Sequence, residues 1–129
     1  MKARGFLYYW FPVIIYAGII FYFSSLSNPL PQGMPSFNYM DLLLHSVEYL
    51  ILSVLLLRAL LHYNTSHPYL FSIAIAALYG ISDEFHQLFV PGRFFAVSDM
   101  AADAFGASLI LIYLLTKHTK SYKTRKAIQ

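Results

Sequence analysis

The chain lacks cysteine, has few charged residues, and has no acidic residue in its tails or in the connections between its hydrophobic segments. The lack of cysteine excludes disulfides, thiolate metal sites and a cysteine nucleophile within this sequence. Charged residues make up only 12% of the 129 residues, whereas a globular domain carries about a quarter. No glycine-rich phosphate loop occurs, and nothing indicates a nucleic-acid partner. The composition therefore argues against a soluble enzyme or a nucleic-acid-binding domain.

Apolar residues dominate instead, at 58% of the chain with a mean hydropathy of +0.55. A helix needs about 20 mainly apolar residues to cross the hydrocarbon core of a membrane. Four segments meet this need, at about residues 6–24, 41–61, 69–89 and 97–116. We therefore predict an all-α membrane protein, a bundle of four transmembrane helices. The short connections leave no room for a second domain, so we expect a single membrane domain over residues 1–129.

The cationic residues indicate how these spans are oriented. Two of the nine Lys and Arg residues lie near the N-terminus, and five lie in the C-terminal tail. The positive-inside rule then places both termini and the 62–68 connection in the cytoplasm. The 25–40 connection, with three prolines and no charge, would lie outside. We expect the first span to be retained, because its apolar run is long and lacks a convincing signal-peptidase site.

All six acidic residues lie within the predicted spans. A carboxylate in hydrocarbon costs from about 2.5 kcal/mol upward, so such residues usually face a partner, a cavity or a ligand. At about 1.5 Å per helical residue, Glu48, Asp83 and Asp103 each lie roughly 10 Å below the outer mouth. The inner halves of these spans are almost wholly apolar. The pattern predicts a polar pocket that is open to the outside and closed toward the cytoplasm.

Helical spacing groups the polar residues into stripes, because residues three, four and seven apart share one face. One stripe comes from each of the last three spans, with Tyr79, Asp83, His86 and Gln87 on the third. Glu84 lies off that stripe, and Gly106 on the fourth span would let another helix approach closely. Ser98 and Asp99 resemble a helix N-cap. The predicted ligand-binding residues of the pocket are Asp41, His45, Glu48, Asp83, Glu84, His86, Gln87, Arg93, Asp99 and Asp103.

Several chemistries remain open for this set. Arg93 has the planar fork that suits phosphate or carboxylate, and His45 and His86 could carry protons. A second possibility is that the set binds a divalent metal ion. Mixed imidazole and carboxylate ligands would suit Zn²⁺, Mn²⁺ or Fe²⁺, and carboxylates alone would suit Mg²⁺ or Ca²⁺. The candidate metal ligands are His45, Glu48, Asp83, His86, Asp99 and Asp103. Catalysis at a lipid-linked phosphate or sugar is a further variant.

Two rival readings come from other classes of protein. Proton or solute transport is disfavoured because no acidic, basic or histidine residue lies between Leu50 and Leu57 or between Leu109 and Leu115, so no charged path crosses the membrane. A structural or accessory membrane protein would use the cluster only to hold its helices together, at about 0.6 kcal/mol for each interhelical hydrogen bond. The sequence leaves the oligomeric state open.

Several motifs resemble those of the VanZ-like family, small bacterial membrane proteins named after a teicoplanin-resistance protein. The resemblance is carried by the run from Asp83 to Arg93 (DEFHQLFVPGR), by Ser98-Asp99, by Asp103-Ala-Phe-Gly106, by Asp41-x-x-x-His45-x-x-x-Tyr49 and by Phe23-Ser-Ser25. The chain departs from the family at Leu42, where Lys is frequent, and at Asp103, where Asn is frequent. Both departures make the pocket more negative.

The resemblance implies a multi-pass protein of the bacterial plasma membrane with a role at the cell envelope. In some members this role extends to glycopeptide resistance. The resemblance does not imply any particular reaction. Our functional prediction is an outward-facing pocket that binds a polar or anionic envelope component or a glycopeptide antibiotic and contributes to teicoplanin-type resistance. The expected partners are membrane lipid and an envelope precursor or glycopeptide.

Overall fold

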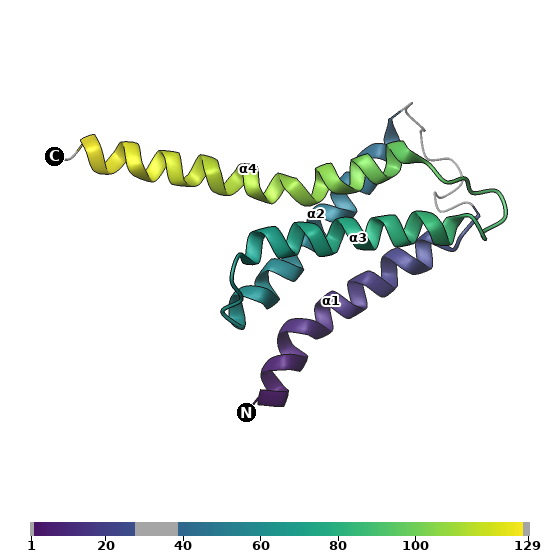
Figure 1. The fold of residues 1–129 in the computed structure, drawn as a ribbon, viewed down its shortest axis with the longest axis horizontal. Helices are drawn as coiled ribbons and strands as arrows, with labels where there is room; N and C mark the ends of the chain where they lie inside the picture. Colours follow the sequence, from purple (N-terminus) through teal and green to yellow (C-terminus); the bar gives the residue numbers. More distant parts are fainter. Residues whose placement is uncertain (1, 28–38, 128–129) are drawn as a thin grey trace.

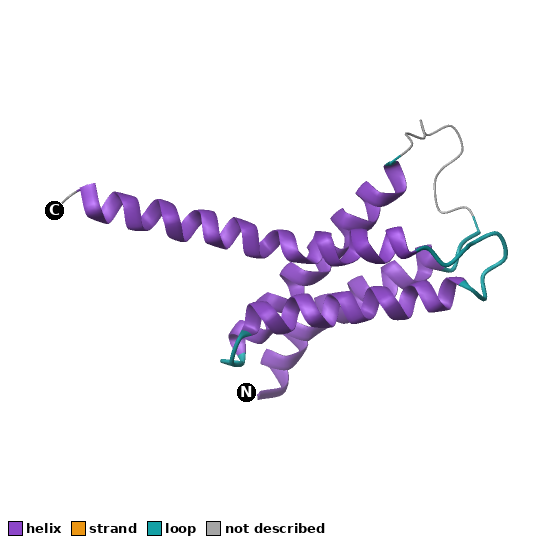
Figure 2. Ribbon diagram, turned by 45° about the horizontal axis from the view of Figure 1, so that its top comes forward, coloured by secondary structure: helices purple, strands orange, loops and turns teal. Residues whose placement is uncertain are grey.

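The computed structural model describes residues 2–27 and 39–127, and every regular element within these residues is an α-helix (Figures 1 and 2). The helices are α1 (Lys2–Ser24), α2 (Met40–His62), α3 (Pro68–Gln87) and α4 (Val97–Ala127). The all-α prediction is thereby confirmed, and each predicted span coincides with one helix. Residues 28–38, which make up most of the predicted outer connection, lie outside the described residues.

Three of the helices in the described part of the chain are long and apolar enough to cross a membrane. These segments are Gly5–Ser24, Met40–His62 and Val97–Thr116. Helix α3 does not meet this standard, because its last turns carry Asp83, Glu84, His86 and Gln87, which lower its mean hydropathy. A membrane protein is supported on composition, whereas the fourth span and the orientation of the termini stay predictions.

The ends of α3 follow from the local sequence. Pro68 occupies the first turn, where its missing N–H costs nothing, and the preceding His67 has a left-handed backbone with φ of 55°. After α3 the chain turns through Pro91 and Gly92, whose φ of 81° favours glycine. This turn brings the chain back toward the bundle and into α4.

The apolar part of α4 that could cross a membrane is Val97–Thr116, as predicted, and the structure adds two details about the ends of the helix. The helix begins at Val97, so Ser98 and Asp99 lie in its first turn and are not N-caps. An acidic residue in the first turn interacts favourably with the helix dipole. The helix also continues past residue 116 to Ala127, because no glycine or proline interrupts the sequence after Gly106. Its C-terminal part extends beyond the other helices (Figure 1).

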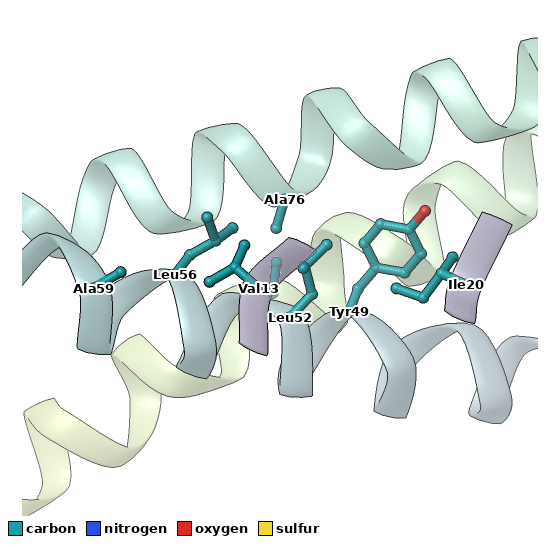
Figure 3. Close-up of a cluster of buried hydrophobic side chains, with 8 residues drawn as sticks. Val13, Ile20, Tyr49, Leu52, Leu56, Ala59 and Ala76 are labelled. Atoms are coloured by element: carbon teal, nitrogen blue, oxygen red, sulfur yellow. The ribbon is translucent and has the colours of Figure 1, made fainter. Parts of the chain in front are cut away.

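The hydrophobic core is organised around α2, which packs against each of the other three helices. Figure 3 shows how the buried side chains of α2 point into the space between α1 and α3. Many large apolar side chains are exposed instead, most densely along α1, as lipid-facing residues of a membrane helix would be. The core cluster contains Val13, Ile20, Tyr49, Leu52, Leu56, Ala59, Ala76 and Ala107.

Small residues bring α2 and α4 into the closest contact in the bundle. A Cβ atom added at Gly106 would overlap the main chain of Ser46, so the prediction of a close helix approach at this glycine is confirmed. Two serine hydroxyls of α2 donate across the interface. Ser46 Oγ bonds to the carbonyl of Ala102 at 3.2 Å, and Ser53 Oγ bonds to that of Ala107 at 3.0 Å. This contact sets the position of the polar residues of α4 relative to α2.

Candidate functional site

A pocket of about 460 Å³ lies at the end of the bundle where α1 and α3 end and α2 and α4 begin. This volume is in the range of small-molecule sites. The opposite end contains the N-terminus and the short α2–α3 connection (Figure 1). The pocket is lined by Ile20, Phe23, Ser24, Asp41, Leu44, His45, Glu48, Asp83, Gln87, Gly92, Arg93, Phe94, Ala96 and Asp99.

Gln87 joins the loop after α3 to the end of α1. Its Oε1 accepts a hydrogen bond from Arg93 Nε at 3.2 Å, and its Nε2 donates to Ser24 Oγ at 3.2 Å. The side chain of Gln87 is almost fully buried, so the bond to Ser24 is buried and the bond to Arg93 is partly buried. Gln87 therefore holds the guanidinium of Arg93 at the pocket wall. The ion pairs within the described residues all involve His45, and neither of them includes Arg93.

His45 links α2 to α4 through two aspartates. Its Nδ1 lies 2.8 Å from Oδ1 of Asp103, and its Nε2 lies 3.7 Å from Oδ2 of Asp99. The ring is nearly buried, whereas Asp99 is partly exposed at the pocket wall. A charge-assisted contact of 2.8 Å in such a place is strong, and it fixes the orientation of the imidazole.

Three buried carboxylates lie around this histidine, and each has an oxygen without a hydrogen-bond partner. The exposed fractions of Asp83, Glu84 and Asp103 are 4%, 0% and 1%. The unpaired atoms are Asp83 Oδ1, Glu84 Oε1 and Asp103 Oδ2, and the hydroxyl of Tyr49 is also unpaired. Buried polar atoms without partners are rare in folded proteins, and each calls for an explanation such as a bound ion.

Glu84 also shapes the start of α4. Its Oε2 accepts a hydrogen bond from the backbone N–H of Ala96, the residue before the helix, at 3.0 Å. One ligand atom of Glu84 lies within 4.8 Å of one each from His45 and Asp103. We call these three residues the His45 cluster. They come from three different helices, so the fold itself assembles the cluster.

The structure brings together nine of the ten residues predicted from the sequence. Seven line the pocket, and Glu84 and Asp103 lie buried beside His45. His86 is separate, because its Nε2 lies 3.0 Å from Ser25 Oγ and its ring packs against Phe21 with the ring centroids 4.3 Å apart. The residues that line the pocket from the predicted set are Asp41, His45, Glu48, Asp83, Gln87, Arg93 and Asp99.

The sequence places Glu84 among the pocket residues but not among the metal ligands, and it does not place Ser24 in the pocket. Glu84 lies off the main polar stripe of its helix, yet it is fully buried one turn after Gly80. The signal for this face is the row of small residues at four-residue spacing, Ser72, Ala76 and Gly80, which continues into Glu84. Ser24 belongs to the Phe23-Ser-Ser25 motif, which marks the family resemblance but does not indicate a pocket residue.

Comparison with known proteins gives one match. The family model described as VanZ/LLP1 matches residues 9–117, a range that contains every residue of the pocket and of the His45 cluster. This match confirms the resemblance drawn from the motifs. No curated protein and no solved structure matches the chain.

Proposed function

This chain belongs to the VanZ/LLP1 family, and from that premise we propose a multi-pass protein of the bacterial cell membrane whose pocket binds a polar component of the cell envelope. The function rests on one observation. A single pocket combines an apolar wall with a dense set of carboxylates and one guanidinium.

We propose that all four helices cross the membrane and that both termini are cytoplasmic. Helix α3 has 20 residues, which is about 30 Å of helix and equals the hydrocarbon thickness of a bilayer. The polar residues that lower its hydropathy face the pocket or the His45 cluster, with His86 as the exception, so few of them would meet lipid. The pocket then opens toward the outer leaflet, on the side where envelope precursors are used.

The lining favours an amphipathic ligand. Ile20, Phe23 and Leu44 form an apolar wall suited to a hydrocarbon chain, and Phe94 at the rim is 82% exposed. The rest of the lining includes carboxylates from α2, α3 and α4. These groups accept hydrogen bonds from hydroxyl and amino groups, while Arg93 can donate a bidentate pair to phosphate or carboxylate. A lipid-linked headgroup with both kinds of group fits this lining.

The structural rival explains the site less well. Carboxylates that served only to hold helices together would have both oxygens paired, because an unpaired buried acceptor costs about 1–3 kcal/mol. Here three carboxylates each keep a free oxygen. The helices are already joined by close contacts at Gly106 and by the hydroxyls of Ser46 and Ser53. Joining the helices therefore does not explain why three carboxylates are buried with an unpaired oxygen.

The test compares two arginines at opposite ends of the bundle. Arg93 lines the pocket, whereas the guanidinium of Arg58 lies 4.6 Å from the ring centroid of Tyr8 at the other end. Arg93→Gln and Asp99→Asn should abolish co-purification of the envelope lipid in native mass spectrometry and should restore teicoplanin susceptibility in an expressing host. Arg58→Gln, at equal membrane abundance, should leave both unchanged. Equal behaviour of the Arg93 and Arg58 variants would contradict the proposal.

A further inference from the structure

We infer that the His45 cluster, His45, Glu84 and Asp103, binds one divalent transition-metal ion of the Zn²⁺ or Mn²⁺ type. This ion site lies beside the pocket and is independent of which molecule the pocket binds. It uses Glu84, which spacing along the sequence did not place among the metal ligands.

The first support is the convergence of ligand atoms from three helices. One atom each of His45, Glu84 and Asp103 lies within 4.8 Å of the other two. With metal–ligand distances of about 2.1 Å, two ligands of one ion lie at most about 4.2 Å apart. In a tetrahedral site two ligand atoms lie about 3.4 Å apart, so side-chain movements of up to about 1 Å would complete the site. Imidazole combined with carboxylate is a ligand set that suits Zn²⁺, Mn²⁺ or Fe²⁺.

The second support is independent of this spacing. Glu84 and Asp103 are 0% and 1% exposed, and Glu84 Oε1 and Asp103 Oδ2 have no hydrogen-bond partner. The free oxygen of Asp103 points at α3, because a Cβ atom at Gly80 would lie only 2.6 Å from it. Gly80 is one helical turn before Glu84, so Glu84 and the free oxygen of Asp103 lie on the same side of α3. Two buried carboxylates that each keep an unpaired oxygen there are what a bound cation would satisfy.

The charges agree with a divalent ion. A neutral imidazole with two carboxylates carries a charge of about −2, and a buried charge of that size needs compensation. The nearest arginine of the pocket, Arg93, is held by Gln87. One further bond prepares the site, because the N–H of Ala96 fixes the carboxylate of Glu84, as outer bonds do for metal ligands in known sites. His45 Nδ1 and Asp103 Oδ1 lie 2.8 Å apart, and an ion bound to both would replace the hydrogen bond between them.

The test begins with the unmodified protein, purified in detergent after treatment with a chelator and dialysis. Titration with Zn²⁺ and, separately, Mn²⁺ should show about one ion per chain by elemental analysis. The ion should raise the melting temperature by at least about 3 °C, because it ties α2, α3 and α4 together in the folded state only. A protein that takes up neither ion and shows no thermal shift would overturn the inference.

A pair of matched variants then locates the ion. Glu84→Gln keeps the acceptor for Ala96 and removes the charge, so it should weaken metal affinity at least about tenfold. His62→Gln removes an imidazole at the opposite end of the bundle, where it stacks on Tyr9, and should keep the affinity of the unmodified protein. Circular dichroism before metal is added checks that both variants are folded. Unchanged affinity in Glu84→Gln, or a loss in His62→Gln alone, would show that the cluster does not hold the ion.

Discussion

Gly106 of α4 lies directly against the main chain of Ser46 on α2, with no room for a side chain between the two helices. Gly106→Ala should force the helices apart and cost about 1–3 kcal/mol or more in stability, as overpacking does in other cores. The loss should appear as a lower melting temperature of the purified protein. Gly18→Ala is the matched control, because nothing lies within 4 Å of a Cβ atom at that position. Equal melting temperatures for the two variants would contradict the contact.

Gly80 has a similar role toward Asp103. A Cβ atom at Gly80 would lie 2.6 Å from Asp103 Oδ2 and 3.0 Å from its Cβ. Gly80→Ala should therefore displace the carboxylate and lower the melting temperature.

Shortening the side chain of Asp103 tests whether the destabilisation by Gly80→Ala comes from a clash with that side chain. In an Asp103→Ala background most of the cost of Gly80→Ala should disappear, giving a coupling of about 0.5–3 kcal/mol in a double-mutant cycle. The loss of the His45 contact in Asp103→Ala cancels within the cycle. Additive effects of the two changes would mean that Gly80 and Asp103 are not in contact.

The hydroxyl of Tyr79 on α3 donates a hydrogen bond of 2.7 Å to the carbonyl of Ala17 on α1. Because α1 packs mainly on α2 and only slightly on α3, this bond is a large part of the α1–α3 contact. Tyr79→Phe should cost about 0.5–1.5 kcal/mol, read as a lower midpoint in denaturant unfolding. Tyr22→Phe removes an exposed hydroxyl from α1 and is expected to leave the midpoint unchanged. A midpoint for Tyr79→Phe that equals that of the Tyr22 variant would argue against the bond.

The helices and the depth of the polar residues could be predicted, because both depend only on position along the chain. Runs of about 20 apolar residues fix where a membrane helix lies. Counting 1.5 Å per residue places Glu48, Asp83 and Asp103 at one level, and the structure has Glu48 and Asp83 in the pocket and Asp103 buried beside His45. Gly106 could be recognised for a similar reason, since small residues in such helices mark close contacts.

The rotation of each helix was harder to predict. In a soluble protein the apolar face marks the interior, but a membrane helix is apolar on its lipid side as well as on its core side. Little in the pattern then decides whether His86 or Glu84 faces the bundle. The structure buries Glu84 and packs His86 against Phe21. A hydrogen bond across the turn after α3 was also not predicted. Arg93 meets Gln87 because of the path taken after α3, which depends on the fold of the whole loop.

The four-span topology can be tested with single cysteines, because the unmodified chain has none to interfere. Ser66 lies just before α3 and Ser98 lies in the first turn of α4, after the α3–α4 connection, and both are exposed. Ser66→Cys and Ser98→Cys are therefore a matched and nearly isosteric pair. If α3 crosses the membrane, a membrane-impermeant maleimide added to intact cells should label the cysteine at 98 and should reach the cysteine at 66 only after permeabilisation. The positive-inside rule sets this direction, since it keeps the 62–68 connection with the basic termini. Labelling of both positions from the same side would mean that α3 enters and leaves the membrane on one face, and the pocket would then have no assured route to the outer leaflet.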